Sequence, residues 1–367
     1  MRKRIILLGS TGSIGRQTLE VCREFPQKFE IIGLAGGQNF QLLKKQIAEF
    51  RPRFIATSVP KKLALREGGG FKNTKILLLE KLASQKCDLV VSAIAGVAGL
   101  SPTLAAIRAQ NSVALANKES LVLAGGIVMN SARKFGVKIL PVDSEHSAVW
   151  QILQKIPKDK IAKIILTASG GALRDTPLAQ FPKISSQKVL LHPTWSMGQK
   201  ITLDCATMAN KAFEIIEAAH LFDFPLEKIS AVIHPQSFVH ALVETVDGNL
   251  FAQMSRPSMK LPISLALFDG ERQKNSVAGL NLVGQNLEFS QIEKNRYPLF
   301  FTILEAAKRG GIFPAAAAAA SEFFGQKFLA GKIAFPEIAK LTAKSLQKVQ
   351  QKPANLKNIL ATVNSFQ

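Results

Sequence analysis

The residues best suited to chemistry in this sequence are two carboxylates that follow a short apolar run. Asp143 and Glu145 lie in the stretch LPVDSEH (140–146), and the apolar run at 137–140 predicts a buried strand. In extended backbone, side chains two residues apart point to the same side, so we expect both carboxylates to aim at one point. Clustered carboxylate oxygens are the ligands that hard divalent cations prefer, which makes this stretch a candidate metal site.

A purely structural interpretation of the same stretch is also open. The residues at 148–153 have the spacing of a helix face, so Asp143 or Ser144 would cap that helix and Glu145 would be solvated. Taken alone, the stretch favours this structural interpretation, because acidic residues at helix starts are common. The rest of the chain reverses the preference.

A glycine-rich turn follows the first predicted strand. The strand spans 5–8, the turn GSTGSIG spans 9–15, and a helix is predicted over 16–25. Glycines at such intervals let backbone amides approach a pyrophosphate, which the helix N-terminus also attracts. In its strand-turn-helix context the turn indicates dinucleotide binding, with an ordinary tight turn as the alternative.

The end of the second strand indicates which dinucleotide is bound. The predicted strand 29–35 ends in Gly36-Gly37-Gln38-Asn39, which contains no acid to bind the ribose hydroxyls of NAD. This favours NADP, although the nearest basic residues are Lys44 and Lys45, so amides and neutral side chains would hold the 2′-phosphate.

Strands and helices alternate through the first part of the chain. Further strands are predicted at 54–56, 76–79, 88–94 and 113–116, which implies a parallel, doubly wound α/β sheet. Strands at 231–234 and 238–243 with a hairpin turn at 247–249 then indicate an α+β domain. The region after Gly270 is polar and irregular to about Glu293, and the chain is helical from Leu299 onward.

We therefore expect the chain to have four parts. They are an NADPH-binding domain at 1–143, a catalytic domain that binds metal and substrate at 144–266, a linker at 267–291 and a C-terminal helical domain at 292–367.

Three stretches of the predicted second domain add polar groups. Ala168-Ser169-Gly170-Gly171 has the small residues of an anion-binding turn. The stretch HPTWSMG begins a loop at 192–200 that suggests a lid over a ligand. A helix is predicted in which Lys211, Glu214 and Ala218 share one face. Glu214 either supplies a third carboxylate to a metal site or is an ordinary surface residue.

Composition limits the class of protein. The chain has 367 residues, enough for two or three domains, and its formal charge is +21, but the lysines are scattered without a basic run. A nucleic-acid binder is therefore an unfavoured alternative, to be tested by DNA retardation at physiological salt. Three cysteines far apart in sequence indicate reduced thiols, and no apolar run reaches the length of a signal peptide core or a membrane span. We expect a soluble cytoplasmic protein that binds neither nucleic acid nor membrane.

Taken together, these segments resemble the 1-deoxy-D-xylulose 5-phosphate reductoisomerase family over roughly the first three quarters of the chain. The matching motifs are LGSTGSIG (8–15), AGVAGLSPTLAAIRA (95–109), LANKESLV (115–122), PVDSEH (141–146), the turn at Ser169, HPTWSMG (192–198), MANK (208–211) with Glu214, and IHPQS (233–237). The resemblance implies a homodimeric enzyme that uses NADPH and a divalent cation, Mg²⁺ or Mn²⁺ with Co²⁺ as a third candidate.

The resemblance also implies a reaction. 1-Deoxy-D-xylulose 5-phosphate, a phosphorylated sugar, would become 2-C-methyl-D-erythritol 4-phosphate in the non-mevalonate route to isoprenoids. The cation would bind the carbonyl and adjacent hydroxyl oxygens during a retro-aldol and aldol rearrangement. NADPH would then reduce the aldehyde.

Site residues carry over from the matching motifs. The resemblance implies that Asp143, Glu145 and Glu214 are catalytic residues that bind the metal, and that Glu145 and Glu214 also contact the substrate. Lys118 is implied as a catalytic residue that, with Ser144, contacts substrate hydroxyls. The implied cofactor contacts are Thr11, Gly12, Ser13 and Ile14 for the pyrophosphate, Gly37, Gln38 and Asn39 for the adenosine phosphate, and Asn117, Glu119 and Gly198 for the nicotinamide. The implied phosphate contacts are Ser169, His192, Asn210 and Lys211, with Cys205 at a further position of that site, and the implied lid residues are Trp195 and Met197.

Several positions depart from the family pattern. Cys205 stands where the family usually has a serine that donates to the phosphate, and Gln38 replaces a residue that is often basic. Arg256-Pro257-Ser258-Met259-Lys260 replaces an acidic segment, and Ala318 and Ser321 replace asparagines. A simple NADP-dependent reductase or aldehyde dehydrogenase on the same fold is the alternative enzyme, but it leaves the three carboxylates without a task.

Overall fold

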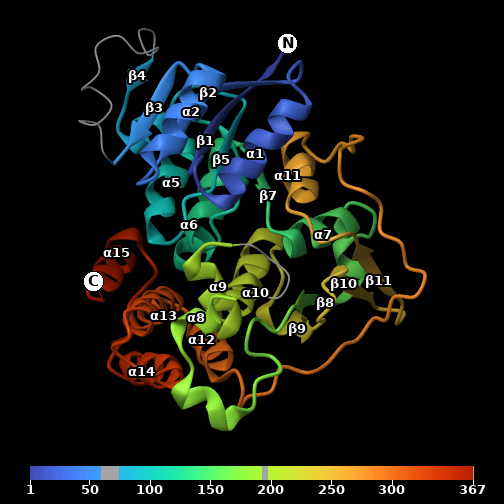
Figure 1. Cartoon of the computed structure of the whole chain (residues 1–367), viewed down its shortest axis with the longest axis vertical. Helices are drawn as coiled ribbons and strands as arrows, with labels where there is room; N and C mark the ends of the chain where they lie inside the picture. The colour runs from blue at the N-terminus through green and yellow to red at the C-terminus, as the bar shows by residue number, and fades with distance from the viewer. Residues whose placement is uncertain (59–73, 192–196, 367) are drawn as a thin grey trace. The chain divides into compact units, whose positions relative to one another are not determined.

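The computed structural model describes residues 1–58, 74–191 and 197–366 (Figure 1). The chain forms two compact units that do not follow chain order. The N-terminal unit comprises Met1–Ser120, Val128–Ser147 and Ser258–Val277. The C-terminal unit comprises Leu121–Ile127, Ala148–Pro257 and Ala278–Gln367. No helix of the described ranges is both long and apolar enough to cross a membrane.

The N-terminal unit is built on a parallel sheet, as predicted. Its strand order is β4-β3-β2-β1-β5-β6-β7, and each neighbouring pair is parallel. The strands are β1 Lys3–Leu8, β2 Phe29–Gly36, β3 Phe54–Thr57, β4 Lys75–Ile76, β5 Leu89–Ser92, β6 Ser112–Leu115 and β7 Ile139–Pro141. The order of the strands reverses between β1 and β5, and ligands bind at the carboxyl ends of such switch points. The predicted doubly wound α/β class is therefore confirmed.

The burial of side chains explains most of these strands and also explains one strand whose length was predicted wrongly. Ile5, Ile6, Leu7 and Leu8 are fully buried, as expected for a central parallel strand that is covered on both faces. The strand predicted at 76–79 is wrong beyond Ile76, because α4 (Leu79–Ala83) begins there. β4 is an edge strand whose apolar residues face solvent, so apolar composition alone overestimated its length.

The helices of the N-terminal unit include one that comes from late in the chain. They are α1 Ser13–Glu24, α2 Phe40–Phe50, α4, α5 Leu100–Arg108 and α11 Lys260–Leu267, with η1 Val97–Gly99. α11 packs beside α1 (Figure 1). The Phe268 ring, which follows α11, meets the rings of Phe25 and Phe29 edge to face. Lys260 also forms ion pairs with Glu20 and Glu24. Two helices contribute residues to both units, α6 Glu119–Phe135 and α7 Ser144–Leu153.

The C-terminal unit contains a mixed sheet of order β11-β10-β8-β9. Its strands are β8 Ile161–Ala168, β9 Ile229–Ile233, β10 Val239–Thr245 and β11 Leu250–Met254. β8 and β9 are parallel and the other pairs antiparallel. The predicted hairpin turn at 247–249 is confirmed, with Gly248 at φ +83°.

Helices make up the rest of the C-terminal unit. They are α8 Ser186–Val189, α9 Gln199–Ala206, α10 Ala209–Phe222, α12 Pro298–Arg309, α13 Phe313–Leu329, α14 Phe335–Gln347 and α15 Leu356–Asn364, with short 3₁₀ turns η2 Lys158–Lys160, η3 Leu178–Lys183 and η4 Leu226–Lys228. α13 contacts α12, α14 and α15, and its alanine run at 315–320 is buried. Ala318 and Ser321 lie in this buried part of α13 and pack as small residues. Between α11 and α12 the chain is irregular, as predicted, apart from one bridge between Ile233 and Ser290.

Substitutions in the glycine-rich turn test its packing. A Cβ at Gly15 would overlap the Gly9 carbonyl oxygen, whereas one at Gly12 would stay 3.4 Å from it. We therefore expect Gly15→Ala to lower the free energy of unfolding by about 2–3 kcal/mol. Gly12→Ala is the control and should cost at most about 1 kcal/mol. Urea unfolding followed by circular dichroism measures both, and equal losses would contradict this account of the turn.

Candidate active site

The turn after β1 is packed tightly against its neighbours. Gly9 has φ +88°, and both its N–H and that of Ser10 donate to the Ala35 carbonyl, at 3.0 and 2.8 Å. A Cβ at Gly9 would overlap the Ala93 carbonyl that follows β5. A side chain at Gly9 or Gly15 would therefore force β1, α1 and the β5 loop apart.

The N-terminus of α1 suits a pyrophosphate. Gly12 is the N-cap, it offers no side chain to the first amides, and the first turn contains no acidic residue. The amides and the helix dipole of this turn thus favour an anion. Thr11, Gly12, Ser13 and Ile14, the predicted pyrophosphate contacts, all lie here, so the residues present fit NADPH.

The end of β2 lies at the same edge of the sheet. Around Gly37 there is open space for a ligand, since a Cβ there would meet nothing within 4 Å. The Asn39 side chain caps α2 by accepting from the Leu42 amide at 3.1 Å. This structural role occupies the Asn39 carbonyl, so contacts between the adenosine phosphate and Gly37, Gln38 or Asn39 stay a prediction.

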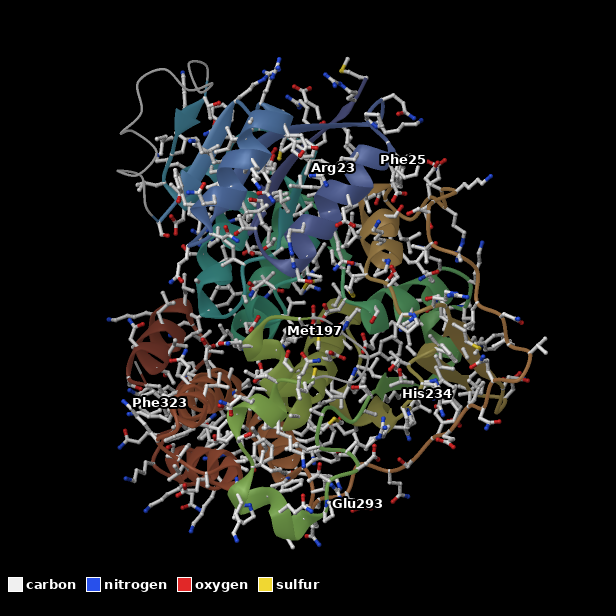
Figure 2. All side chains as sticks on the ribbon, in the orientation of Figure 1. Arg23, Phe25, Met197, His234, Glu293 and Phe323 are labelled. Carbon is white, nitrogen blue, oxygen red and sulfur yellow. The ribbon has the colours of Figure 1, made fainter. Side chains whose placement is uncertain are left out.

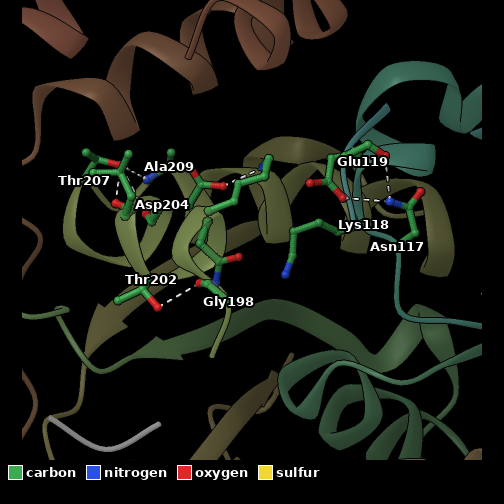
Figure 3. A network of polar contacts seen from close by, with 12 residues as sticks. Asn117, Lys118, Glu119, Gly198, Thr202, Asp204, Thr207 and Ala209 are labelled. Carbon is green, nitrogen blue, oxygen red and sulfur yellow. Dashed lines mark hydrogen bonds and ion pairs between the residues drawn. The ribbon is translucent and has the colours of Figure 1, made fainter. Parts of the chain in front are cut away.

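Asn117 organises the loops after β5 and β6 (Figure 3). Its amide nitrogen donates to the Gly96 carbonyl and to Glu119 Oε2, both at 2.9 Å. Its oxygen accepts from the amide and the hydroxyl of Ser120. These four bonds use the full capacity of the amide, which is buried. Contacts from Asn117 to a nicotinamide would therefore come from its backbone, while Glu119 is oriented by the Asn117 amide.

Lys118 and Asp143 join the ends of neighbouring strands β6 and β7. Lys118 Nζ lies 2.7 Å from Asp143 Oδ2, and their side chains are only 8% and 14% exposed. Charges this far from water need compensation, which each supplies to the other. The predicted catalytic lysine and the first predicted metal ligand thus meet within the N-terminal unit.

The predicted geometry of Asp143 and Glu145 is wrong. α7 begins at Ser144, and the Ser147 amide donates to the Asp143 carbonyl at 2.8 Å, so helical hydrogen bonding starts directly after Asp143. Glu145 is therefore in the first helical turn and not in extended backbone. Its Oε2 accepts from the Ser144 hydroxyl at 2.6 Å. Asp143 directly precedes the helix and its carbonyl accepts the first helical hydrogen bond, while its side chain pairs with Lys118.

α10 carries the third predicted carboxylate. Lys211 and Glu214 share one helix face, as predicted, and there they form an ion pair. Asn210 Nδ2 donates to Glu214 Oε1 at 2.5 Å. Lys211 is 3% exposed and Glu214 is 2% exposed, so the alternative that Glu214 is a surface residue is wrong. A buried ionised pair of this kind is typical of a functional site.

The Ser169 turn lies against the end of α9. Gly170 and Gly171 have φ +82° and +69°, and the Gly171 amide donates to Ser169 Oγ at 3.2 Å. A Cβ at Gly171 would lie 2.6 Å from the Cys205 carbonyl oxygen. The turn that carries Ser169 therefore lies against the backbone at Cys205. Sequence reasoning missed Arg174 and Tyr297, which bond to carbonyls of this turn.

The predicted lid lies largely outside the described residues. His192 and Trp195 belong to the range 192–196, which is not described. Met197 is described, and Gly198 is the N-cap of α9 and accepts from the Thr202 hydroxyl at 2.9 Å (Figures 2 and 3). The contact of Gly198 with a nicotinamide stays a prediction.

The donor set fits a hard divalent cation. Asp143 directly precedes α7, Glu145 lies in its first turn, and Glu214 lies on α10 of the C-terminal unit. All three offer carboxylate oxygen, the donor type that Mg²⁺ and Mn²⁺ prefer. Lys118 and Lys211 each compensate one of these charges. The meeting of the three carboxylates around one ion stays a prediction.

Comparison with known proteins assigns the family. Residues 5–125 match the family model described as 1-deoxy-D-xylulose 5-phosphate reductoisomerase. Residues 139–222 match its C-terminal domain, and residues 254–366 match the model described as the DXP reductoisomerase C-terminal domain. A reductoisomerase of this name from Thermus thermophilus is 42% identical over 98% of this chain and 96% of its own length. One from Trichlorobacter lovleyi is 45% identical over 95% of this chain and 91% of its own length.

Solved structures agree with these matches. A crystal structure of DOX-P reductoisomerase in complex with NADPH, fosmidomycin and magnesium has a TM-score of 0.94 and 38% identity, over 99% of this chain and 96% of that one. The Zymomonas mobilis 1-deoxy-D-xylulose 5-phosphate reductoisomerase in complex with NADPH has a TM-score of 0.90 and 35% identity, over 100% of this chain and 97% of that one. This chain belongs to the 1-deoxy-D-xylulose 5-phosphate reductoisomerase family.

Proposed function

We propose that this protein converts 1-deoxy-D-xylulose 5-phosphate to 2-C-methyl-D-erythritol 4-phosphate, a step of non-mevalonate isoprenoid biosynthesis. The protein is an NADPH-dependent reductoisomerase that requires a divalent cation. The observation that carries this proposal is the identity of 42% with a reductoisomerase over 98% of the chain. The glycine turn and the carboxylates described above suit the two cofactors.

The chain contributes binding, orientation and charge. NADPH supplies the hydride and the cation supplies a Lewis acid for the substrate oxygens. Asp143, Glu145 and Glu214 hold the cation, and the turn at Thr11–Ile14 holds the dinucleotide phosphates. Lys118, fixed by Asp143, places an ammonium donor beside the substrate hydroxyls, and Ser144 provides a second polar contact.

The phosphate of the substrate binds in the C-terminal unit. Ser169, Asn210 and Lys211 donate to it, together with His192, and Cys205 lies beside them. The closeness of the Ser169 turn to the Cys205 backbone supports this assignment. Trp195 and Met197 cover the bound substrate and exclude water from the reaction.

A functional division of the chain accompanies this assignment. Residues 1–143 bind NADPH, and residues 144–266 bind metal and substrate and carry the lid at 192–200. Residues 267–291 form the linker, and residues 292–367 form the helical domain.

The protein acts in the cytoplasm as a homodimer and binds neither nucleic acid nor membrane. The scattered lysines and the irregular chain between α11 and α12 support these assignments.

Two of the three cysteines, Cys22 and Cys87, do not suit the nucleophile of an aldehyde dehydrogenase. Burial raises the pKa of the Cys22 thiol and of the Cys87 thiol to about 12. Both therefore stay protonated at neutral pH, and a protonated thiol is a poor nucleophile. Neither cysteine suits the covalent step that such an enzyme needs.

A metal-dependence assay tests the proposed function. NADPH oxidation with 1-deoxy-D-xylulose 5-phosphate should stop when EDTA is added and return with excess Mn²⁺. Asp143→Asn should lower kcat on the order of 10²-fold or more, because it removes a carboxylate that holds the cation. Asp159→Asn is the matched control, since Asp159 has an exposed side chain and should leave the rate unchanged. Turnover that persists in EDTA would refute the metal-dependent reaction.

A substitution at Cys205 tests the phosphate site. A thiol is a weak donor, so Cys205→Ser should add a hydrogen bond worth about 1 kcal/mol. We expect the KM for the phosphorylated sugar to fall about five-fold with kcat unchanged. Cys205→Ala is the control, and it should not lower the KM. Steady-state kinetics measure all three proteins, and an unchanged KM in the serine variant would place Cys205 away from the phosphate.

A further inference from the structure

We propose that Tyr297 and Arg174 are positioning residues of the phosphate site. They hold the carbonyl oxygens of the Ser169–Gly171 turn away from the ligand and so direct its donors toward the substrate phosphate. This inference rests on the proposed function, because it concerns the phosphate site of that reaction. It adds two residues that do not touch the substrate themselves.

Three consecutive carbonyls of the turn are each bound by a donor of the protein. The Ala168 carbonyl accepts from the His234 amide at 2.7 Å. The Ser169 carbonyl accepts from Arg174 Nη1 at 3.0 Å. The Gly170 carbonyl accepts from the Tyr297 hydroxyl at 2.9 Å. The negative ends of three peptide dipoles therefore point into the protein.

Because the peptide bond is planar, the direction of each bound carbonyl also fixes the direction of the following N–H group. In a trans peptide the N–H points opposite to the C=O of the preceding residue. The Gly171 N–H therefore points away from Tyr297, and it donates to Ser169 Oγ at 3.2 Å. A hydroxyl that accepts this bond retains the ability to donate its own proton. Tyr297 thus acts on Ser169 through one rigid peptide plane.

The backbone conformation of the turn also helps to keep its carbonyls away from the proposed phosphate. Gly170 and Gly171 both have positive φ, at +82° and +69°. Glycine adopts positive φ without strain, so this turn can keep its carbonyls off the side proposed to face the phosphate. A carbonyl that rotated onto that side would repel a phosphate, and the donors of Arg174 and Tyr297 oppose that rotation.

Tyr297 is well suited to act as a fixed hydrogen-bond donor. It is the only tyrosine of the sequence, and it is 1% exposed at the start of α12. Burial raises the pKa of its phenol to about 12, so it remains a donor at neutral pH. The neighbouring Arg296 donates to the carbonyls of Leu173 and Thr176 at 3.0 and 2.7 Å, which fixes the chain after the turn.

Tyr297→Phe tests the inference because it removes one hydroxyl and keeps the buried ring. We expect a rise of about five-fold in the KM for 1-deoxy-D-xylulose 5-phosphate, with kcat within about two-fold, from the loss of one positioning hydrogen bond. The Kd for inorganic phosphate should rise by a similar factor in calorimetry. The Kd for NADPH and kcat/KM with unphosphorylated 1-deoxy-D-xylulose should stay unchanged, since neither involves the phosphate.

Thr245→Val is the matched control. Thr245 is also buried, and its hydroxyl lies within hydrogen-bond distance of the Asp247 carboxylate and of the Asn249 carbonyl in the β10–β11 hairpin. Thr245 pairs with Ile161, at the opposite end of β8 from the turn. This variant should lose stability comparable to Tyr297→Phe and keep the KM of the wild type.

Arg174→Met is the second variant, used also if Tyr297→Phe does not fold. Its apolar stem keeps the packing against Gly170, while the donor to the Ser169 carbonyl is lost. We expect the same rise in KM and in the Kd for inorganic phosphate. An unchanged KM in the folded variants, or equal losses with the unphosphorylated sugar, would overturn the inference.

The two proposals fail in distinguishable ways. A wild-type protein that does not oxidise NADPH with 1-deoxy-D-xylulose 5-phosphate would refute the proposed function. The Kd for inorganic phosphate still tests the inference in that case. Equal phosphate affinities in the wild type and in Tyr297→Phe would refute the positioning role even if the wild type is fully active.

Discussion

A buried ion pair between Lys118 and Asp143 is the interaction on which the candidate site depends. Carboxylates removed from water must be compensated, and loss of one partner of such a pair typically costs about 3–5 kcal/mol. The pair joins the loops after β6 and β7, so it fixes the start of α7 and with it the backbone of Glu145. Lys211 compensates Glu214 in the same way on α10. In each unit a lysine therefore pairs with one of the predicted acidic ligands and orients its side chain.

Backbone direction is the second constraint. At the switch point between β1 and β5 the chain turns back at Gly9, where only glycine avoids the Ala93 carbonyl. The Ser169 turn is held differently, by donors that come from later parts of the chain. Both turns are fixed by hydrogen bonds of their peptide groups, from the Gly9 and Ser10 amides to the Ala35 carbonyl and from Arg174 and Tyr297 to the carbonyls of Ser169 and Gly170. The dinucleotide phosphates and the sugar phosphate would thus each meet a turn whose backbone is held in place.

Local patterns in the sequence predicted the features that depend on local forces. The apolar run at 5–8, the glycines of the first turn and the hairpin at 247–249 follow from burial and turn chemistry, and all three are confirmed. The pairing of Lys211 with Glu214 follows from helix periodicity. The extended backbone predicted at Glu145 is wrong because α7 begins earlier than the apolar face of the helix suggests. Tyr297 could not be found from sequence patterns, because its partner Gly170 lies far away in the chain and no local signal connects them.

The proposed reaction requires Asp143, Glu145 and Glu214 to bind one cation together. Anomalous diffraction from crystals of the protein grown with Mn²⁺ tests this most directly, because it locates the ion independently of activity. The account predicts one strong peak with an oxygen of each carboxylate at about 2.1 Å, the distance typical of hard divalent cations of this size. A peak bound by Asp143 and Glu145 without Glu214, or a peak elsewhere, would contradict it.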